Sequence, residues 1–105
     1  MAWIYLVLAG VFEIGWPVGL KMSQQAETRL TGIMLAVGFM AISGWLLWMA
    51  QKQIPIGTAY AVWTGIGAAG TFLLGVLWYG DPASLGRFFG VALIVGGVVI
   101  LKLAH

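Results

Sequence analysis

Four long apolar segments account for most of this sequence. They lie at about residues 2–20, 30–50, 56–79 and 85–104, and short polar breaks separate them. Each segment has close to the ~20 residues that a helix needs to cross a hydrocarbon core about 30 Å thick. With 62% hydrophobic and 8% charged residues, a chain of 105 residues has too little polar surface for a soluble domain. The sequence therefore predicts an all-α membrane protein in which four transmembrane helices form a single domain over residues 1–105.

The composition excludes several classes of function. Cysteine is absent and the only histidine is His105, so no disulfide, thiolate nucleophile or Cys/His metal site can form. No nucleophile–base constellation is recognisable, and we expect neither an enzyme nor a bound cofactor or metal. Five scattered Lys and Arg residues give a net charge of +2, which is too sparse for a nucleic-acid partner. The partner that this composition predicts is the lipid bilayer.

The polar breaks contain residues that start and end helices. Pro55 is predicted in the first turn of the third helix, where its missing N–H leaves no carbonyl without a donor. Gly80, Asp81 and Pro82 are predicted to be a C-terminal glycine, an N-cap and the first residue of the fourth helix. Because the breaks are short, successive helices should be antiparallel.

The positive charges are nearly balanced across the membrane. Lys52 and Lys102 belong to one side, and Lys21, Arg29 and Arg87 to the other. Since the Lys and Arg bias sets the orientation of a membrane protein, this balance predicts that the chain inserts both ways. One fixed orientation, set by other details, is the alternative.

Glu13 is the feature that points to function. It is the only acidic or basic side chain between the start of the first segment and Lys21, which lies ~12 Å further along a helix, so Glu13 falls near the middle of the bilayer. A charge at that depth costs several kcal/mol, and helix packing does not require a carboxylate. We interpret Glu13 as a site for which a proton and a cation compete, which is sufficient for antiport. A protonated Glu13 that hydrogen-bonds a neighbouring helix is the alternative.

Two residues share the helix face of Glu13. Gly10 and Trp16 lie three residues before and after it. Gly10 is expected to leave room beside the carboxylate, and the indole N–H of Trp16 is a potential donor to it. The alternative for Trp16 is an anchor at the membrane interface.

The second and third segments supply further candidates. Ser43 is the only polar side chain between Thr31 and Gln51, and its alternative role is a hydroxyl bonded to its own helix. Tyr60 and Trp63 are three residues apart, and both offer a hydrogen-bond donor and an aromatic face to a cation. Their alternative role is packing.

Glycines predict a hinge and a dimer interface. Gly65 and Gly67 lie close together in the middle of the third segment, where they indicate a bend or hinge. Gly90 and Gly97 lie seven residues apart on one face of the fourth segment, which has no polar residue between Arg87 and Lys102. Such a stripe of small residues predicts a helix contact, and we interpret this helix as the dimerisation element. An antiparallel pair of chains would supply two Glu13 carboxylates and the inverted repeat on which alternating access usually depends.

At this point the residues match a known family. The sequence resembles the small multidrug resistance transporters along its whole length, and within them the guanidinium exporter (Gdx) subtype. The motifs that carry the resemblance are Glu13, the Gly57–Gly67 stretch GTAYAVWTGIG and the Gly90/Gly97 stripe, with Gly10, Trp16, Leu20-Lys21 and Ser43 as marks of the subtype.

The resemblance implies an antiparallel homodimer, or a pair with a paralogous chain, in the bacterial inner membrane. It implies exchange of protons for guanidinium-like cations bound by Glu13 of both subunits. Trp16 and Ser43 would orient the carboxylate, and Tyr60 and Trp63 would line the site. A broader exporter of substituted or quaternary ammonium cations and a non-transporting assembly subunit are the alternatives, and Glu13 argues against the second.

The sequence departs from the subtype at two places. Pro17 stands where the subtype typically has alanine, and the Gly44-Trp45 step beside Ser43 is unusual. Pro17 removes the N–H that would bond the Glu13 carbonyl, so we expect it to bend the helix and loosen the selectivity for guanidinium.

Overall fold

The computed structural model describes residues 1–104, and it confirms four membrane-length helices. They are α1 (Ala2–Ser23), α2 (Arg29–Ala50), α3 (Ile56–Trp78) and α4 (Leu85–Ala104), with a short 3₁₀ helix, η1 (Ala26–Thr28), before α2. All four long helices have the length and the hydropathy to cross a membrane. The described chain is therefore all-α, as the apolar segments predict.

The first helix is longer than its apolar segment. α1 continues three residues past Leu20 and ends at Ser23. Its last carbonyls find partners in the turn that follows, since Thr28 Oγ1 donates to Met22 O at 2.6 Å and Arg29 Nε donates to Ser23 O at 3.2 Å. These bonds satisfy helix-end acceptors that would otherwise need water, and they hold the α1–α2 turn closed.

The start of α4 corrects one prediction. Gly80 has φ +69° and ends α3 as expected. Asp81 is not the N-cap of α4, because its N–H returns to Gly75 O at 2.9 Å and so belongs to the end of α3. Ser84 caps α4 instead, and its Oγ accepts the N–H of Arg87 at 3.2 Å. Pro82 consequently lies in the connection and not in the first turn of α4.

Pro55 lies one residue outside the position predicted for it. α3 begins at Ile56, and Pro55 is its N-cap residue with φ −56° and ψ 144°. The carbonyl of Pro55 accepts the N–H of Ala59 at 2.9 Å, so the proline still opens the helix without removing a bond from it.

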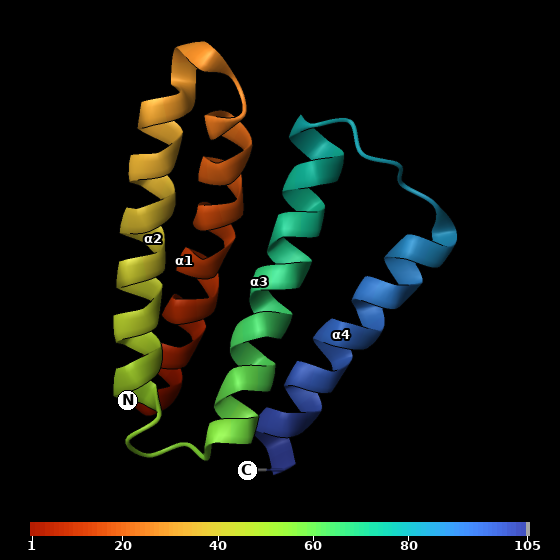
Figure 1. Cartoon of the computed structure of the whole chain (residues 1–105). Coiled ribbons are helices and arrows are strands. Elements are labelled where there is room, and N and C mark those ends of the chain that lie inside the picture. The colour runs from red at the N-terminus through yellow and green to blue at the C-terminus, as the bar shows by residue number, and fades with distance from the viewer. Residues whose placement is uncertain (105) are drawn as a thin grey trace.

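The four helices form a flat layer in which α1 lies between α2 and α3 (Figure 1). The layer measures 45 × 34 × 16 Å. α1 and α2 approach to backbone contact, because a Cβ atom built at Gly19 would lie 2.6 Å from Ala36 N. Glycine at this position permits the close approach of two helices. α4 leans on α3 at its C-terminal end and diverges from it toward its N-terminal end (Figure 1).

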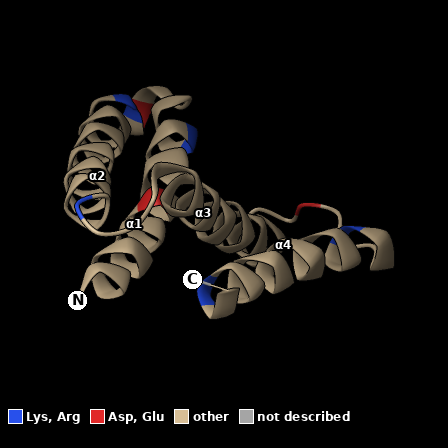
Figure 2. Ribbon diagram, turned by 90° about the horizontal axis from the view of Figure 1, so that it is seen from below, with Lys and Arg blue, Asp and Glu red and all other residues tan. Residues whose placement is uncertain are grey.

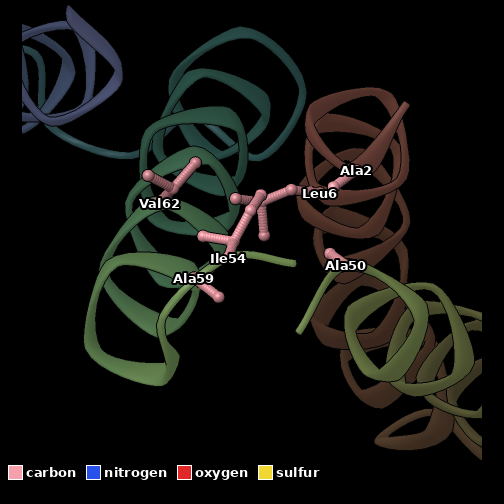
Figure 3. Packing of buried hydrophobic residues seen from close by; sticks show 6 residues of the cluster. All are labelled: Ala2, Leu6, Ala50, Ile54, Ala59 and Val62. Atoms are coloured by element: carbon pink, nitrogen blue, oxygen red, sulfur yellow. The ribbon is translucent and has the colours of Figure 1, made fainter. Parts of the chain in front are cut away.

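A small apolar core fixes the N-terminal half of α1 against α3 (Figure 3). Leu6 and Val62 are fully buried at its centre. The whole cluster consists of Ala2, Leu6, Ala50, Ile54, Ala59 and Val62. Because this core joins α1, α3 and the end of α2, it sets the position of the α1 face that carries Glu13.

Basic side chains rest on aromatic rings at the helix ends. The Nζ of Lys52 lies 4.4 Å from the Trp48 ring centroid, and the Nζ of Lys102 lies 4.8 Å from that of Trp3. Figure 2 shows that the basic segments lie near the helix ends, whereas an acidic segment of α1 faces α3 inside the layer. Aromatic and basic residues at both rims are typical of membrane interfaces.

Candidate functional site

Glu13 lies where α1 contacts α3 at Gly67. A Cβ atom built at Gly67 would lie 2.5 Å from Cγ of Glu13, so the carboxylate side chain occupies the space that this glycine leaves. Glu13 is half-buried in the single chain. Of the residues in the four helices α1–α4, it is the one acidic side chain.

The Glu13 side chain lines a cavity of about 260 Å³ between α1 and α3. Trp16 and Glu13 thus line one cavity within a single chain, and the donation of the indole N–H to the carboxylate stays a prediction. The complete lining is Glu13, Trp16, Pro17, Thr64, Gly67, Ala68 and Thr71.

Four lining residues were not among the sequence candidates for the site, and these are Pro17, Thr64, Ala68 and Thr71. The spacing of three of them nevertheless contained a signal. Pro17 lies four residues after Glu13, on the same helix face. Thr64 and Thr71 lie three residues before and four residues after Gly67, which places them on one face of α3. The hydroxyl of Thr64 donates to Tyr60 O at 2.8 Å and so serves its own helix.

Ser43 joins three helices. Its buried hydroxyl donates to Ala9 O at 2.7 Å and accepts the indole N–H of Trp63 at 2.8 Å. The alternative of a hydroxyl bonded to its own helix is therefore wrong. Ala9 lies four residues before Glu13, so its carbonyl is the helical acceptor of the Glu13 N–H. Ser43 and Trp63 thus hold the backbone turn that carries Glu13, and they do not line the Glu13 cavity.

Tyr60 and Gly10 also lie outside this cavity. The Tyr60 ring lies 5.5 Å from the Trp63 ring at an interplanar angle of 57°, and Tyr60 is exposed. Gly10 is buried between α1 and α3, where an added Cβ would lie 2.7 Å from Cβ of Ile66. Gly10 therefore allows the two helices to approach, and in one chain the room it leaves is filled by Ile66.

The other glycine candidates differ in whether a neighbouring side chain occupies the space where a Cβ atom would lie. α3 is continuous through Gly65 and Gly67, and a Cβ at Gly65 would lie 2.7 Å from Cγ2 of Val98 on α4. Both glycines are thus close contacts in this conformation, and the hinge stays a prediction. At Gly90 and Gly97 an added Cβ would meet no atom within 4 Å. The stripe on α4 is therefore open in the single chain.

Metal ligation has no support in residues 1–104, where no three His, Cys, Asp or Glu side chains gather closely enough to hold an ion. The chemistry that the site offers is that of one carboxylate, an indole donor and two hydroxyls in a cavity inside a helix layer. Together the fold and this cavity describe a multi-pass membrane protein that places a carboxylate in a cavity between two of its long apolar helices.

Comparison with known proteins identifies the family to which the chain belongs. A family model described as Small Multidrug Resistance protein matches residues 1–94. The chain is 51% identical over 104 residues to the guanidinium exporter of Yersinia pseudotuberculosis serotype I (strain IP32953), with 99% of each chain covered. It is 46% identical to the guanidinium exporter of Proteus vulgaris, again with 99% of each chain covered. It is also 46% identical to the guanidinium exporter of Salmonella typhimurium (strain LT2), where the alignment covers 99% of this chain and 98% of the relative.

The chain therefore belongs to the small multidrug resistance family. The resemblance stated from the sequence motifs is confirmed, and the family and its relatives are transporters and not enzymes.

Proposed function

We propose that this protein exports guanidinium or small guanidinium-like cations in exchange for protons. The observation that carries the proposal is Glu13, which lies in a cavity between two membrane-spanning helices beside the indole of Trp16. The names of relatives that are 46–51% identical support guanidinium as the substrate.

The shape of guanidinium suits this site. The ion is planar, and its N–H groups match the two oxygens of a carboxylate in a bidentate pair. The Trp16 side chain, which lines the same cavity as Glu13, would restrict the direction in which the carboxylate points. A quaternary ammonium has no N–H to donate, so it would gain charge attraction and dispersion contacts but no hydrogen bond.

Proton coupling follows from having one carboxylate for two ligands. A protonated Glu13 is neutral and does not attract a cation, and a cation-bound Glu13 does not accept a proton. Because the two ligands compete, a proton gradient drives export if only loaded carboxylates change sides. The apparent affinity for guanidinium should therefore rise as the pH rises and protons become scarcer.

We further propose that two copies of the chain assemble as an antiparallel homodimer. The layer is 16 Å thick, Glu13 is only half-buried, and none of the residues of α4 is buried. A second layer would enclose the cavity and supply a second carboxylate. The near balance of Lys and Arg between the two sides permits opposed orientations.

The test is transport by purified protein in liposomes. In the proposed dimer, two Glu13 carboxylates would release two protons for each guanidinium bound, so the exchange moves net charge. Capacitive currents on a solid-supported membrane should appear with guanidinium and guanylurea, and tetraethylammonium should give weaker currents. Glu13→Gln should abolish the currents, because the amide binds neither the proton nor the cation by charge. Proton-coupled guanidinium exchange by the Gln variant would refute the carboxylate mechanism. Equal currents for all three cations would favour the broader exporter.

A further inference from the structure

A second cavity continues the groove from Glu13 toward the membrane surface. It has a volume of about 140 Å³ and lies where α1 and α3 end. Pro17 and Thr71 line both this cavity and the Glu13 cavity. Pro17 is ~6 Å along α1 from Glu13, and Lys21, in the second cavity, is ~12 Å along it. The two cavities are thus consecutive segments of one α1–α3 groove.

The outer cavity holds groups that suit a cation. These groups are the Tyr79 ring and the Asp81 carboxylate, and Lys21 lines the same cavity. The Asp81 N–H bonds Gly75 O at 2.9 Å, and the Asp81 carboxylate lies over Gly75, where it occupies the space of the missing Cβ. The positive φ of Gly80 turns the chain back and so places Asp81 over the end of α3. The carboxylate is therefore held at the groove by the backbone turn.

The same cavity already contains a cation of the protein itself. The Nζ of Lys21 lies 5.7 Å from the centroid of the Tyr79 ring. This distance is within the range of a cation–π contact. The Lys ammonium sits on a flexible stem of four carbons, so it can leave the ring without any movement of α1.

The junction of the two cavities offers a further acceptor. Pro17 has no N–H, so the Glu13 carbonyl lacks the donor that residue 17 would normally supply. This carbonyl lies between Glu13 and Pro17, which both line the inner cavity. A cation that moves along the groove would pass from the Asp81 carboxylate to the Glu13 carboxylate.

We propose that the outer cavity is a second cation site, at which Asp81 and the Tyr79 ring bind a guanidinium-class cation between water and Glu13. The ammonium of Lys21 occupies this site until the arriving cation displaces it. This inference rests on the proposed function, because it names the path by which the same substrate reaches the same carboxylate.

The test distinguishes cation binding in the outer cavity from cation binding at Glu13. For wild type and variants, the guanidinium concentration that gives half-maximal initial current (KM) is measured in liposomes, and the equilibrium Kd is measured by titration. Asp81→Asn should raise KM about fivefold, as expected for one lost charge contact, and leave Kd unchanged. Lys21→Gln should lower KM by a similar factor, because the competing cation is gone. Asp81→Glu should keep KM close to that of wild type.

Matched controls test whether the effect belongs to the cavity. Glu27 lies in the α1–α2 turn, at the same end of the layer as the α3–α4 connection (Figure 1). Glu27→Gln removes the same charge as Asp81→Asn, and Arg87→Gln removes the same charge as Lys21→Gln, but neither residue lines the cavity. Both controls should leave KM unchanged.

Three outcomes would overturn the outer site. The first is an unchanged KM in Asp81→Asn, with wild-type currents that still depend on Glu13. The second is an equal effect of Glu27→Gln, which would mean that the charges act only through the surface potential. The third is a raised KM in Asp81→Glu as well, which would give Asp81 a structural role. A wild-type protein without any guanidinium current would refute the proposed function itself, and the outer site with it.

Discussion

At the scale of single residues, the site depends on how the turn before Glu13 is held. The chain of hydrogen bonds from Trp63 through Ser43 to Ala9 O joins α3, α2 and α1. Its last acceptor belongs to the helical turn that leads into Glu13. We therefore expect Ser43 to act on the direction of the carboxylate through the backbone of α1, and Trp16 to act on it directly from its place beside Glu13.

Ser43→Ala should weaken guanidinium binding more than tetraethylammonium binding. The substitution leaves the Trp63 N–H without its acceptor and releases the Ala9 carbonyl, so the carboxylate loses its fixed angle. The expected cost for guanidinium is about 1 kcal/mol, the usual net contribution of one hydrogen bond. Binding titrations of guanidinium, guanylurea and tetraethylammonium measure it. Ser23→Ala is the control, because the Ser23 hydroxyl bonds Leu20 O of its own helix and does not line the Glu13 cavity. An equal loss of affinity for all three cations would show that the site recognises its ligands by charge alone.

Pro17→Ala distinguishes two consequences of the same proline. α1 continues through Pro17 without interruption. If the free Glu13 carbonyl helps to bind N–H groups, restoring the donor at position 17 should weaken guanidinium binding about fivefold, with little change for tetraethylammonium. The bend predicted from the sequence would give the opposite sign, because a straighter helix would favour guanidinium. The ratio of the two Kd values, measured for both proteins, decides between them.

At the scale of helices, hydropathy predicted each span, but not the contacts between spans. The bounds of α2, α3 and α4 follow from length and composition, since a bilayer requires about 20 apolar residues. The hydrogen bond from Ser43 to Ala9 O could not be predicted from the sequence, because the two residues are 34 positions apart and no local pattern encodes a bond at that separation. Asp81 was misassigned for a similar reason, since its bond to Gly75 depends on the turn at Gly80.

The glycines of α3 also show that sequence patterns do not predict contacts between helices. Gly65 and Gly67 were identified in the sequence as a flexible pair, but their neighbours are side chains of other helices. Val98 of α4 fills the space at Gly65, and Glu13 of α1 fills the space at Gly67. Sequence spacing identified positions where small residues matter, and only the packing assigns a neighbour to each.

Gly67→Ala should disturb the site through Glu13. The added Cβ would lie 2.5 Å from Cγ and 3.2 Å from Cβ of Glu13, so either the side chain or α1 must shift. Overpacking of this kind costs about 1–3 kcal/mol, and we expect a loss of guanidinium affinity of tenfold or more. Gly57→Ala is the matched control on the same helix, because an added Cβ there meets no atom within 4 Å. Wild-type affinity in Gly67→Ala would show that Glu13 does not need this position.

Gly97→Val tests the exposed stripe on α4. In the single chain the position is open, so the valine should not disturb the monomer. In a dimer that packs through Gly90 and Gly97, the larger side chain should separate the helices and weaken association. The monomer–dimer equilibrium in detergent or lipid measures this. Gly96→Val, about 100° around the helix, is the control. A fully dimeric Gly97→Val protein would remove this stripe from the interface.

At the scale of the molecule, the single chain exposes more surface than a compact soluble protein of its mass. It exposes 6636 Å², whereas a compact soluble monomer of 11.2 kDa is expected to expose about 5,700 Å². The excess follows from the flat layer and from an α4 that buries none of its residues. Lipid can cover such a surface. Lipid cannot supply a second carboxylate to the cavity at Glu13. The proposed second chain would supply it.

The orientation of each copy is the remaining property of the proposed dimer, and we expect the Lys and Arg distribution to control it. Lys52 and Lys102 lie on one side of the layer, against Lys21, Arg29 and Arg87 on the other. Two or three Lys residues added to the α2–α3 turn should reverse this small bias, and the same number added to the α3–α4 connection should strengthen it. Reporter fusions at the C-terminus should then show a single orientation for each variant.

Function should follow orientation if the working unit is antiparallel. Each biased variant expressed alone should lose most guanidinium transport, because its copies all face one way and cannot form the inverted pair. Co-expression of the two oppositely biased variants should restore transport, since each then finds a partner in the other orientation. Gln residues in place of the added Lys should leave transport at the wild-type level, which separates charge from loop length. Full transport by one biased variant alone would mean that the chain works as a parallel dimer or as a monomer, and that the second carboxylate does not come from an inverted copy.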